Sequence, residues 1–172
     1  MDQQLLNEVK GEYQSLLDQG RLADALPLIM QAAHWADVDS QILAERILLH
    51  GQYGHQINPQ AGAEIARLAA MNGDAQSMYD LYLITASQKG ADRGDQRAMY
   101  WLTRAAKAGL AQAQDTLGLA YLQAKGVERD PLIAREWFEK AIENGMDGSV
   151  QKHLQMAQAM IARADTQNNQ SA

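Results

Sequence analysis

Glycines recur at a fixed interval of 36 residues in this chain of 172 residues, and no other feature constrains the fold as strongly. Two series share the interval, half a period apart: Gly73, Gly109 and Gly145, and Gly54, Gly90 and Gly126. Self-similarity at a period of about 20 to 50 residues is typical of repeat proteins. The first series closes alanine-rich helical segments, and the second would mark the turn inside each helix pair. The sequence therefore predicts repeated helix pairs.

Turn and packing residues follow the same period. Asn58-Pro59 and Asp130-Pro131 lie 72 residues apart, each an N-cap followed by proline at the first helical position, and the middle unit has Gly94-Asp95 nearby. Three repeats are predicted, at residues 37–72, 73–108 and 109–144. Trp101 and Trp137 are in step and are assigned to the core, so that Trp137→Ala should cost about 3–5 kcal/mol.

Both ends of the array are expected to differ from the repeats. Residues 1–36 contain a divergent helix pair around Gly20, with helices predicted at 3–17 and 22–34. Residues 145–164 carry one apolar stripe and are predicted to form a capping helix, because a terminal repeat otherwise exposes its apolar face. Met156 falls off that stripe and is expected to be exposed. Residues 1–164 thus form one solenoid domain, and residues 165–172 are expected to be disordered.

Composition excludes several classes of protein. Helix-forming residues dominate and proline is rare, which favours an all-α fold. The net charge of −6 opposes binding to nucleic acid. Without cysteine the chain has neither disulfides nor a thiolate nucleophile. The sequence shows neither a signal peptide nor a membrane span, which predicts a cytoplasmic protein, or a periplasmic one if a signal peptide has been removed.

The unit that begins at Gly109 resembles the Sel-1-like repeat. The matching residues are Ala113, Leu117, Gly118, Tyr121, Gly126, Val127, Asp130, Ala134, Trp137, Lys140 and Ala141. The middle unit keeps the pattern with Tyr82 at the small position beside Leu81, and the first unit has Glu45 and Arg46 where Leu-Gly is expected. The resemblance implies a right-handed superhelix of antiparallel helix pairs, related to tetratricopeptide repeats, and a role in protein–protein interaction.

The resemblance also implies a concave groove lined by the first helix of each repeat. In the tetratricopeptide register, equivalent positions of successive repeats form parallel rows on this groove. One row consists of Ile47, Leu83 and Leu119, an apolar set suited to anchoring a partner segment. Tyr79 is expected to be exposed beside this row, so that Tyr79→Ala should weaken binding at little cost in stability. The residues expected to bind a partner are Leu43, Ile47, His50, Gln76, Tyr79, Leu83, Gln112, Asp115, Leu119 and Leu122.

The expected function is that of a non-enzymatic, bacterial adaptor, scaffold or inhibitor that holds a protein segment. No catalytic motif occurs, the four histidines lack the spacing of a metal site, and no catalytic, metal-binding or cofactor-binding residue is predicted. Three alternatives remain open. The chain could be an immunity protein that neutralises a toxin, a hydrolase or small-molecule binder using the same groove, or a homo-oligomer assembled through its ends.

Overall fold

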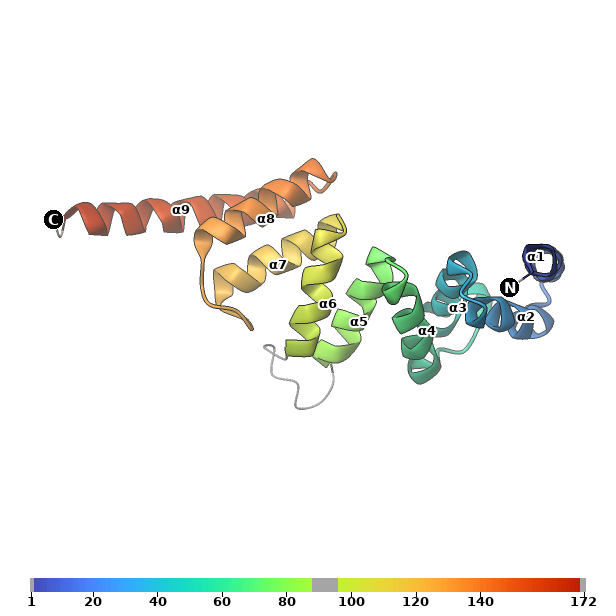
Figure 1. The fold of residues 1–172 in the computed structure, drawn as a ribbon. Helices are drawn as coiled ribbons and strands as arrows, with labels where there is room; N and C mark the ends of the chain where they lie inside the picture. The colour runs from blue at the N-terminus through green and yellow to red at the C-terminus, as the bar shows by residue number, and fades with distance from the viewer. Residues whose placement is uncertain (1, 88–95, 171–172) are drawn as a thin grey trace. The chain divides into compact units, whose positions relative to one another are not determined.

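The computed structural model describes residues 2–87 and 96–170, which form nine α-helices, one 3-10 turn at Gln52–Gly54 and no strand (Figure 1). The helices are α1 (Gln3–Asp18), α2 (Leu22–His34), α3 (Val38–His50), α4 (Pro59–Met71), α5 (Ala75–Ser87), α6 (Gln96–Lys107), α7 (Ala111–Gln123), α8 (Pro131–Glu143) and α9 (Ser149–Gln170). The chain divides into two compact units, Met1–Ser77 and Met78–Ala172. The predicted turn residues Gly90, Gly94 and Asp95 lie outside the described residues.

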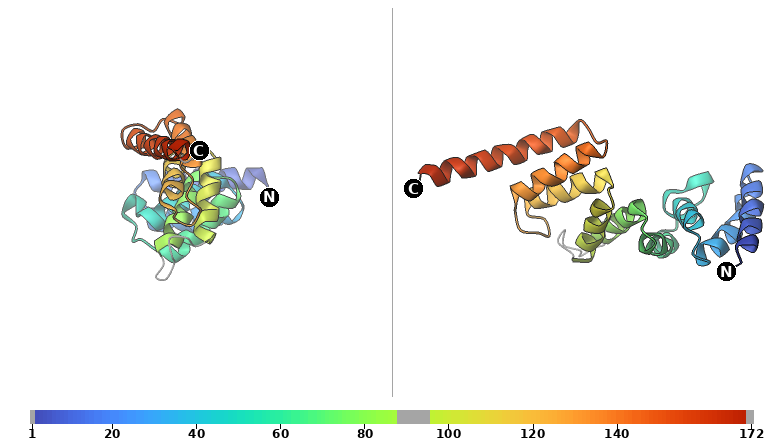
Figure 2. Two further views of the ribbon diagram at one scale, coloured as in Figure 1. Left: turned by 90° about the vertical axis from the view of Figure 1, so that its left-hand side faces the viewer. Right: turned by 45° about the horizontal axis from the view of Figure 1, so that its top comes forward.

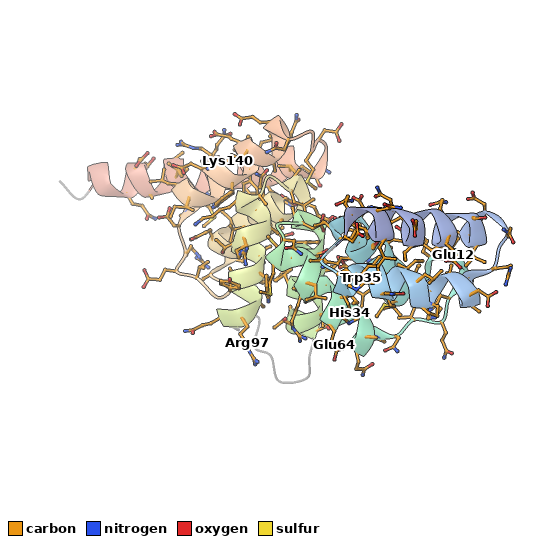
Figure 3. All side chains as sticks on the ribbon, turned by 45° about the vertical axis from the view of Figure 1, so that its right-hand side comes forward. Glu12, His34, Trp35, Glu64, Arg97 and Lys140 are labelled. Atoms are coloured by element: carbon orange, nitrogen blue, oxygen red, sulfur yellow. The ribbon has the colours of Figure 1, made fainter. Side chains whose placement is uncertain are left out.

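The first unit packs α1 against α2, α2 against α3, and α3 against α4. Its core includes Tyr13, Ile29, Ile47 and Ile65, each 5% exposed or less. His34 and Trp35, labelled in Figure 3, lie at the end of α2, where the half-buried Trp35 ring packs against this core. The helix pair at α1 and α2 agrees with the predicted segments 3–17 and 22–34.

A small polar cluster ties α1 to the start of α3. The Lys10 ammonium donates to both Asp37 and Asp39, at 3.0 Å from each nearest carboxylate oxygen. Burial alone would raise the pKa of Asp37, but hydrogen bonds from Ser40 and Lys10 outweigh it and hold that pKa below its ordinary value of 3.8. Burial opposes the charge on Lys10, yet the hydrogen bonds to Asp37 and Asp39 raise its pKa above 10.5.

The second unit packs α6, α7, α8 and α9 in succession, and Figure 2 shows α7, α8 and α9 side by side. Phe138 of α8 is fully buried at the centre of this core, together with Ala134, Ala141 and Val150. Helices α7 and α8 approach closely because Gly118 has no side chain: a Cβ there would lie 2.5 Å from Phe138 Cε1. Gly118 is therefore required because the Phe138 ring occupies the space that a side chain would fill.

Trp101 and Trp137, which recur with the 36-residue period, do not lie in the core, contrary to the prediction. Trp101 and Trp137 are half-buried, and each ring is covered by a cation from the next turn of its own helix. The Arg104 Cζ atom lies 5.5 Å from the Trp101 ring centroid, and Lys140 Nζ lies 4.4 Å from that of Trp137. Since Phe138 fills the core instead, the large cavity cost assigned to Trp137→Ala belongs to Phe138.

Helix α9 is longer than the predicted capping helix. It continues to Gln170, beyond the expected boundary at residue 164 and through most of the segment expected to be disordered. Val150 and Ala157 are fully buried on its apolar stripe, whereas Met156 is 54% exposed, as the pattern predicted. Burial of one face thus fixes the first half of the helix against α8.

Candidate functional site

A cavity of about 290 Å³ lies in the second unit, where α5, α6 and α7 contribute side chains. Its lining residues are Tyr82, Ala86, Met99, Thr116, Leu119, Ala120, Gln123 and Lys125. Apolar atoms dominate this surface, and the two alanines leave the room that larger side chains would fill. Ligand pockets span about 300–1,000 Å³, so this cavity lies just below that range and suits one or two side chains.

Tyr79 supports the cavity wall from inside the protein. Only 5% of Tyr79 is exposed, and its hydroxyl lies 3.1 Å from the Thr116 hydroxyl. Thr116 in turn donates to the Gln112 carbonyl at 2.8 Å. The Tyr79 ring also lies 5.6 Å, centroid to centroid, from Tyr82, which lines the cavity itself. The tyrosine expected to touch a partner therefore positions the residues that line the cavity.

Two of the polar side chains that line the cavity are uncommitted. Among the described residues, the Gln123 amide and the Lys125 ammonium make neither a hydrogen bond nor an ion pair. Leu83 follows Tyr82 on α5 and is 47% exposed. An apolar cavity, an exposed leucine and two uncommitted polar side chains together can hold an apolar side chain and orient the backbone or polar group that follows it.

Four of the ten predicted contact residues are buried, which corrects the expectation that they face a groove. Ile47 is fully buried, and Tyr79, Leu122 and Asp115 are 5%, 4% and 8% exposed. Asp115 is committed to His153 of α9, with Oδ1 and Nδ1 2.7 Å apart. Because these side chains pack inside their own units, they serve the fold. Substituting Tyr79 would therefore cost stability, contrary to the expectation.

The remaining six predicted residues divide between the two units. Leu83, Gln112 and Leu119 belong to the second unit, and Leu119 lines the cavity. Leu43, His50 and Gln76 belong to the first unit, where Leu43 packs against the core while the other two are exposed. In that unit, residues 55–60 line a shallow surface hollow of about 370 Å³.

The misplacement of Ile47 has a simple cause in the register of α3. Helices α3 and α7 have equal length but begin 73 residues apart, while α4 and α8 begin 72 residues apart. The turn after α3 is one residue longer than the turn after α7, and it holds Tyr53 in a left-handed conformation with φ of 57°. Ile47 therefore corresponds to buried Ala120 rather than to Leu119.

Buried glutamines confirm this shifted register. Gln41 of α3 donates to the Ala33 carbonyl of α2 and accepts from Asn72, which follows α4. Gln114 of α7, 73 residues later, donates to the carbonyl of Ala106 on α6 and accepts from the asparagine that follows α8. Both glutamines are at most 3% exposed, so their amide groups are satisfied only by these partners.

Sequence reasoning did not assign Tyr82, Met99, Thr116 or Lys125 to the site. One signal was available, because Tyr82 stands where the repeat pattern has Gly118, a position without room for a side chain between paired helices. An aromatic residue there must turn its ring elsewhere. Lys125 gave no comparable signal, since a lysine after a helix is ordinarily solvated.

The described helices include none with the length and apolarity needed to cross a membrane. Within residues 2–87 and 96–170, no cluster of three or more histidine and acidic side chains has the arrangement of a metal site.

Two fungal proteins are similar in sequence. The chitin synthase regulator SKT5 of Saccharomyces cerevisiae is 32% identical over 122 residues, which cover 70% of this chain and 18% of that protein. The chitin synthase regulatory factor 3 of Schizosaccharomyces pombe is 32% identical over 73 residues, which cover 42% of this chain and 8% of that protein. The chain thus spans less than a fifth of either relative.

Two solved bacterial structures are similar in fold. A Sel1 repeat protein from Oxalobacter formigenes has a TM-score of 0.64 at 31% identity, covering 74% of this chain and 94% of its own. The protein c5321, a protective antigen of uropathogenic Escherichia coli with an SLR fold, has a TM-score of 0.67 at 29% identity, covering 81% of this chain and 31% of its own. They confirm the fold class, an all-α solenoid of helix pairs, while a right-handed superhelix stays a prediction.

The family model for the Sel1 repeat matches residues 42–74, 85–110 and 111–146. These three segments overlap the three predicted repeats and together cover more than half of the chain. This protein therefore belongs to the Sel1 repeat family.

Proposed function

We propose that this chain is a non-enzymatic protein-binding module that holds an apolar side chain of a partner segment in the cavity formed by α5, α6 and α7. The observation that carries the proposal is the cavity itself, a small apolar space whose lining includes Leu119 and two uncommitted polar side chains, Gln123 and Lys125. A pocket of this size is too small for most cofactors but accepts one anchoring side chain.

Membership of the Sel1 repeat family supports this proposal, because stacked helix pairs commonly present binding surfaces to other proteins. The similar fungal proteins are named as a regulator and a regulatory factor of chitin synthase. We extend to this chain the general role, regulation by binding. Whether the chain acts as an adaptor or as an inhibitor depends on the partner.

Peptide selection tests the proposal directly. The full chain is immobilised and challenged with a displayed library of random 12-residue peptides, and enriched peptides are synthesised for affinity measurements by fluorescence anisotropy. We expect Leu119→Ala, which truncates a side chain that lines the cavity, to weaken binding by about tenfold, the loss typical of one anchoring contact.

Leu132→Ala supplies the control for Leu119→Ala, because Leu132 on α8 is an exposed leucine of the same unit that does not line the cavity. Its affinity should equal that of the wild type. Circular dichroism establishes that each variant is folded. Selections that enrich no peptide, or peptides whose affinity is lowered equally by Leu132→Ala, would refute the proposed function.

A further inference from the structure

One edge of the cavity carries a lysine held in a defined place by the backbone. Helix α7 ends at Ala124, which adopts a left-handed conformation with φ of 57° although it is not glycine. The backbone N–H of Lys125 then donates to the Ala120 carbonyl at 2.9 Å. Since Ala120 and Lys125 both line the cavity, this turn fixes the lysine at its edge.

The Lys125 ammonium has no counter-ion within the described part of the chain. Among those same residues, the ones that line the cavity include no acidic side chain. Some other cations of the protein are engaged, since Lys10 is bound by two carboxylates and Lys140 covers the Trp137 ring; what distinguishes Lys125 is its place in the lining of the cavity. A lysine beside an apolar space, without a partner in residues 2–87 and 96–170, is available to a negative group on a ligand.

The charge distribution along the chain favours the same reading. The first unit contains four basic and ten acidic residues and so carries the whole net charge of −6. The second unit contains eleven of each. A negatively charged segment at the cavity therefore meets no net repulsion from the unit that forms the cavity.

We propose that the cavity selects a peptide segment in which an apolar side chain is accompanied by a carboxylate, the apolar group entering between Met99 and Leu119 and the carboxylate accepting from Lys125. The inference rests on the proposed function and adds the chemistry of the partner. Gln123, at the end of α7, supplies an amide that pairs with the backbone of the same segment.

The test uses the same random 12-residue library, selected in parallel against the wild type and Lys125→Glu. Wild-type selections should enrich Asp or Glu within three or four positions of Leu, Met or Phe, whereas Lys125→Glu should lose that preference. A purified acidic peptide should bind Lys125→Glu about tenfold more weakly, as expected for one charge-assisted hydrogen bond, and a peptide with Lys in place of its acid should bind that variant more tightly.

Lys107→Glu is the matched control, because Lys107 is exposed in the same unit, changes the net charge equally and does not line the cavity. Its affinity for the acidic peptide should stay within about twofold of the wild type, since solvent screens distant surface charges. Lysine near a helix C-terminus also favours the helix, so thermal unfolding of both variants separates lost stability from lost binding.

Two peptide forms identify the source of the carboxylate. If an Asp or Glu side chain is bound, amidation of the peptide C-terminus leaves the affinity unchanged; if the terminal carboxylate is bound, amidation abolishes the effect of Lys125→Glu. Peptides that depend on Leu119 but are insensitive to Lys125→Glu would overturn this inference and leave the binding module intact. Failure to enrich any peptide would overturn both.

Discussion

Substituting Gly118 by alanine tests the close approach of α7 and α8. An added Cβ would lie 2.5 Å from Phe138 Cε1 and 2.7 Å from Cδ1, both closer than van der Waals contact allows. Because Phe138 is fully buried, its ring can move only by displacing other core atoms. Overpacking of this kind costs about 1–3 kcal/mol.

A helix-interior alanine is itself favoured over glycine by about 0.8–1.0 kcal/mol. The net effect of Gly118→Ala is therefore a destabilisation of up to about 2 kcal/mol. Gly11 in α1 provides the matched control, since a Cβ added there would have nothing within 4 Å and the residue is exposed. Gly11→Ala should gain only the higher helix propensity of alanine and stabilise the chain by up to about 1 kcal/mol.

Urea unfolding followed by far-ultraviolet circular dichroism measures both free energies. The two substitutions are chemically identical and should shift the unfolding midpoint in opposite directions. Phe138→Leu should relieve the clash, so the Gly118→Ala/Phe138→Leu double variant should lose less than the sum of the single losses. If Gly118→Ala is as stabilising as Gly11→Ala, the packing argument for the family glycine fails.

Three further outcomes are expected from the core and the polar clusters. Phe138→Ala should cost about 3–5 kcal/mol in urea unfolding, whereas Trp137→Ala, removing a half-buried ring, should cost clearly less; equal losses would contradict the core assignment. Gln114→Ala should cost about 1–3 kcal/mol because the buried Ala106 carbonyl and the Asn144 amide lose their hydrogen bonds, and a thermal midpoint equal to that of the wild type would disprove their role. Asp37 contributes to stability above its ordinary pKa of 3.8, and this contribution should be lost as pH falls through its lowered pKa in the folded protein. The thermal midpoint of Asp37→Asn should therefore depend less on pH in the acid range than that of the wild type.

The repeat architecture could be predicted because its signals are local. Glycines in turns and the Asn-Pro and Asp-Pro starts of helices fix where each helix begins and ends, and most bounds agree with the sequence period. The tryptophans show the limit of this reasoning. Spacing placed Trp137 on the packed side of its helix, but spacing alone cannot show that Phe138 is the side chain that reaches Gly118.

The candidate site was predictable only in part. Leu119 was identified, but the cavity depends on how α5, α6 and α7 pack, and on small residues that leave space. The assumption of a constant period also misplaced Ile47, because a single additional residue in the turn after α3 shifts every position of that helix. One residue changes the direction of a helical side chain by about 100°, which is enough to exchange surface for core.

The buried glutamines have a consequence for how the chain unfolds. Gln114 lies in the first helix of its repeat, yet it holds the end of the preceding α6 as well as the residue that follows α8. Cutting the chain at the repeat boundary before Gly109 would leave that amide facing a missing carbonyl. We therefore expect α6, α7 and α8 to unfold together, as a unit that overlaps the sequence repeat and shares part of its stability with the helix before it.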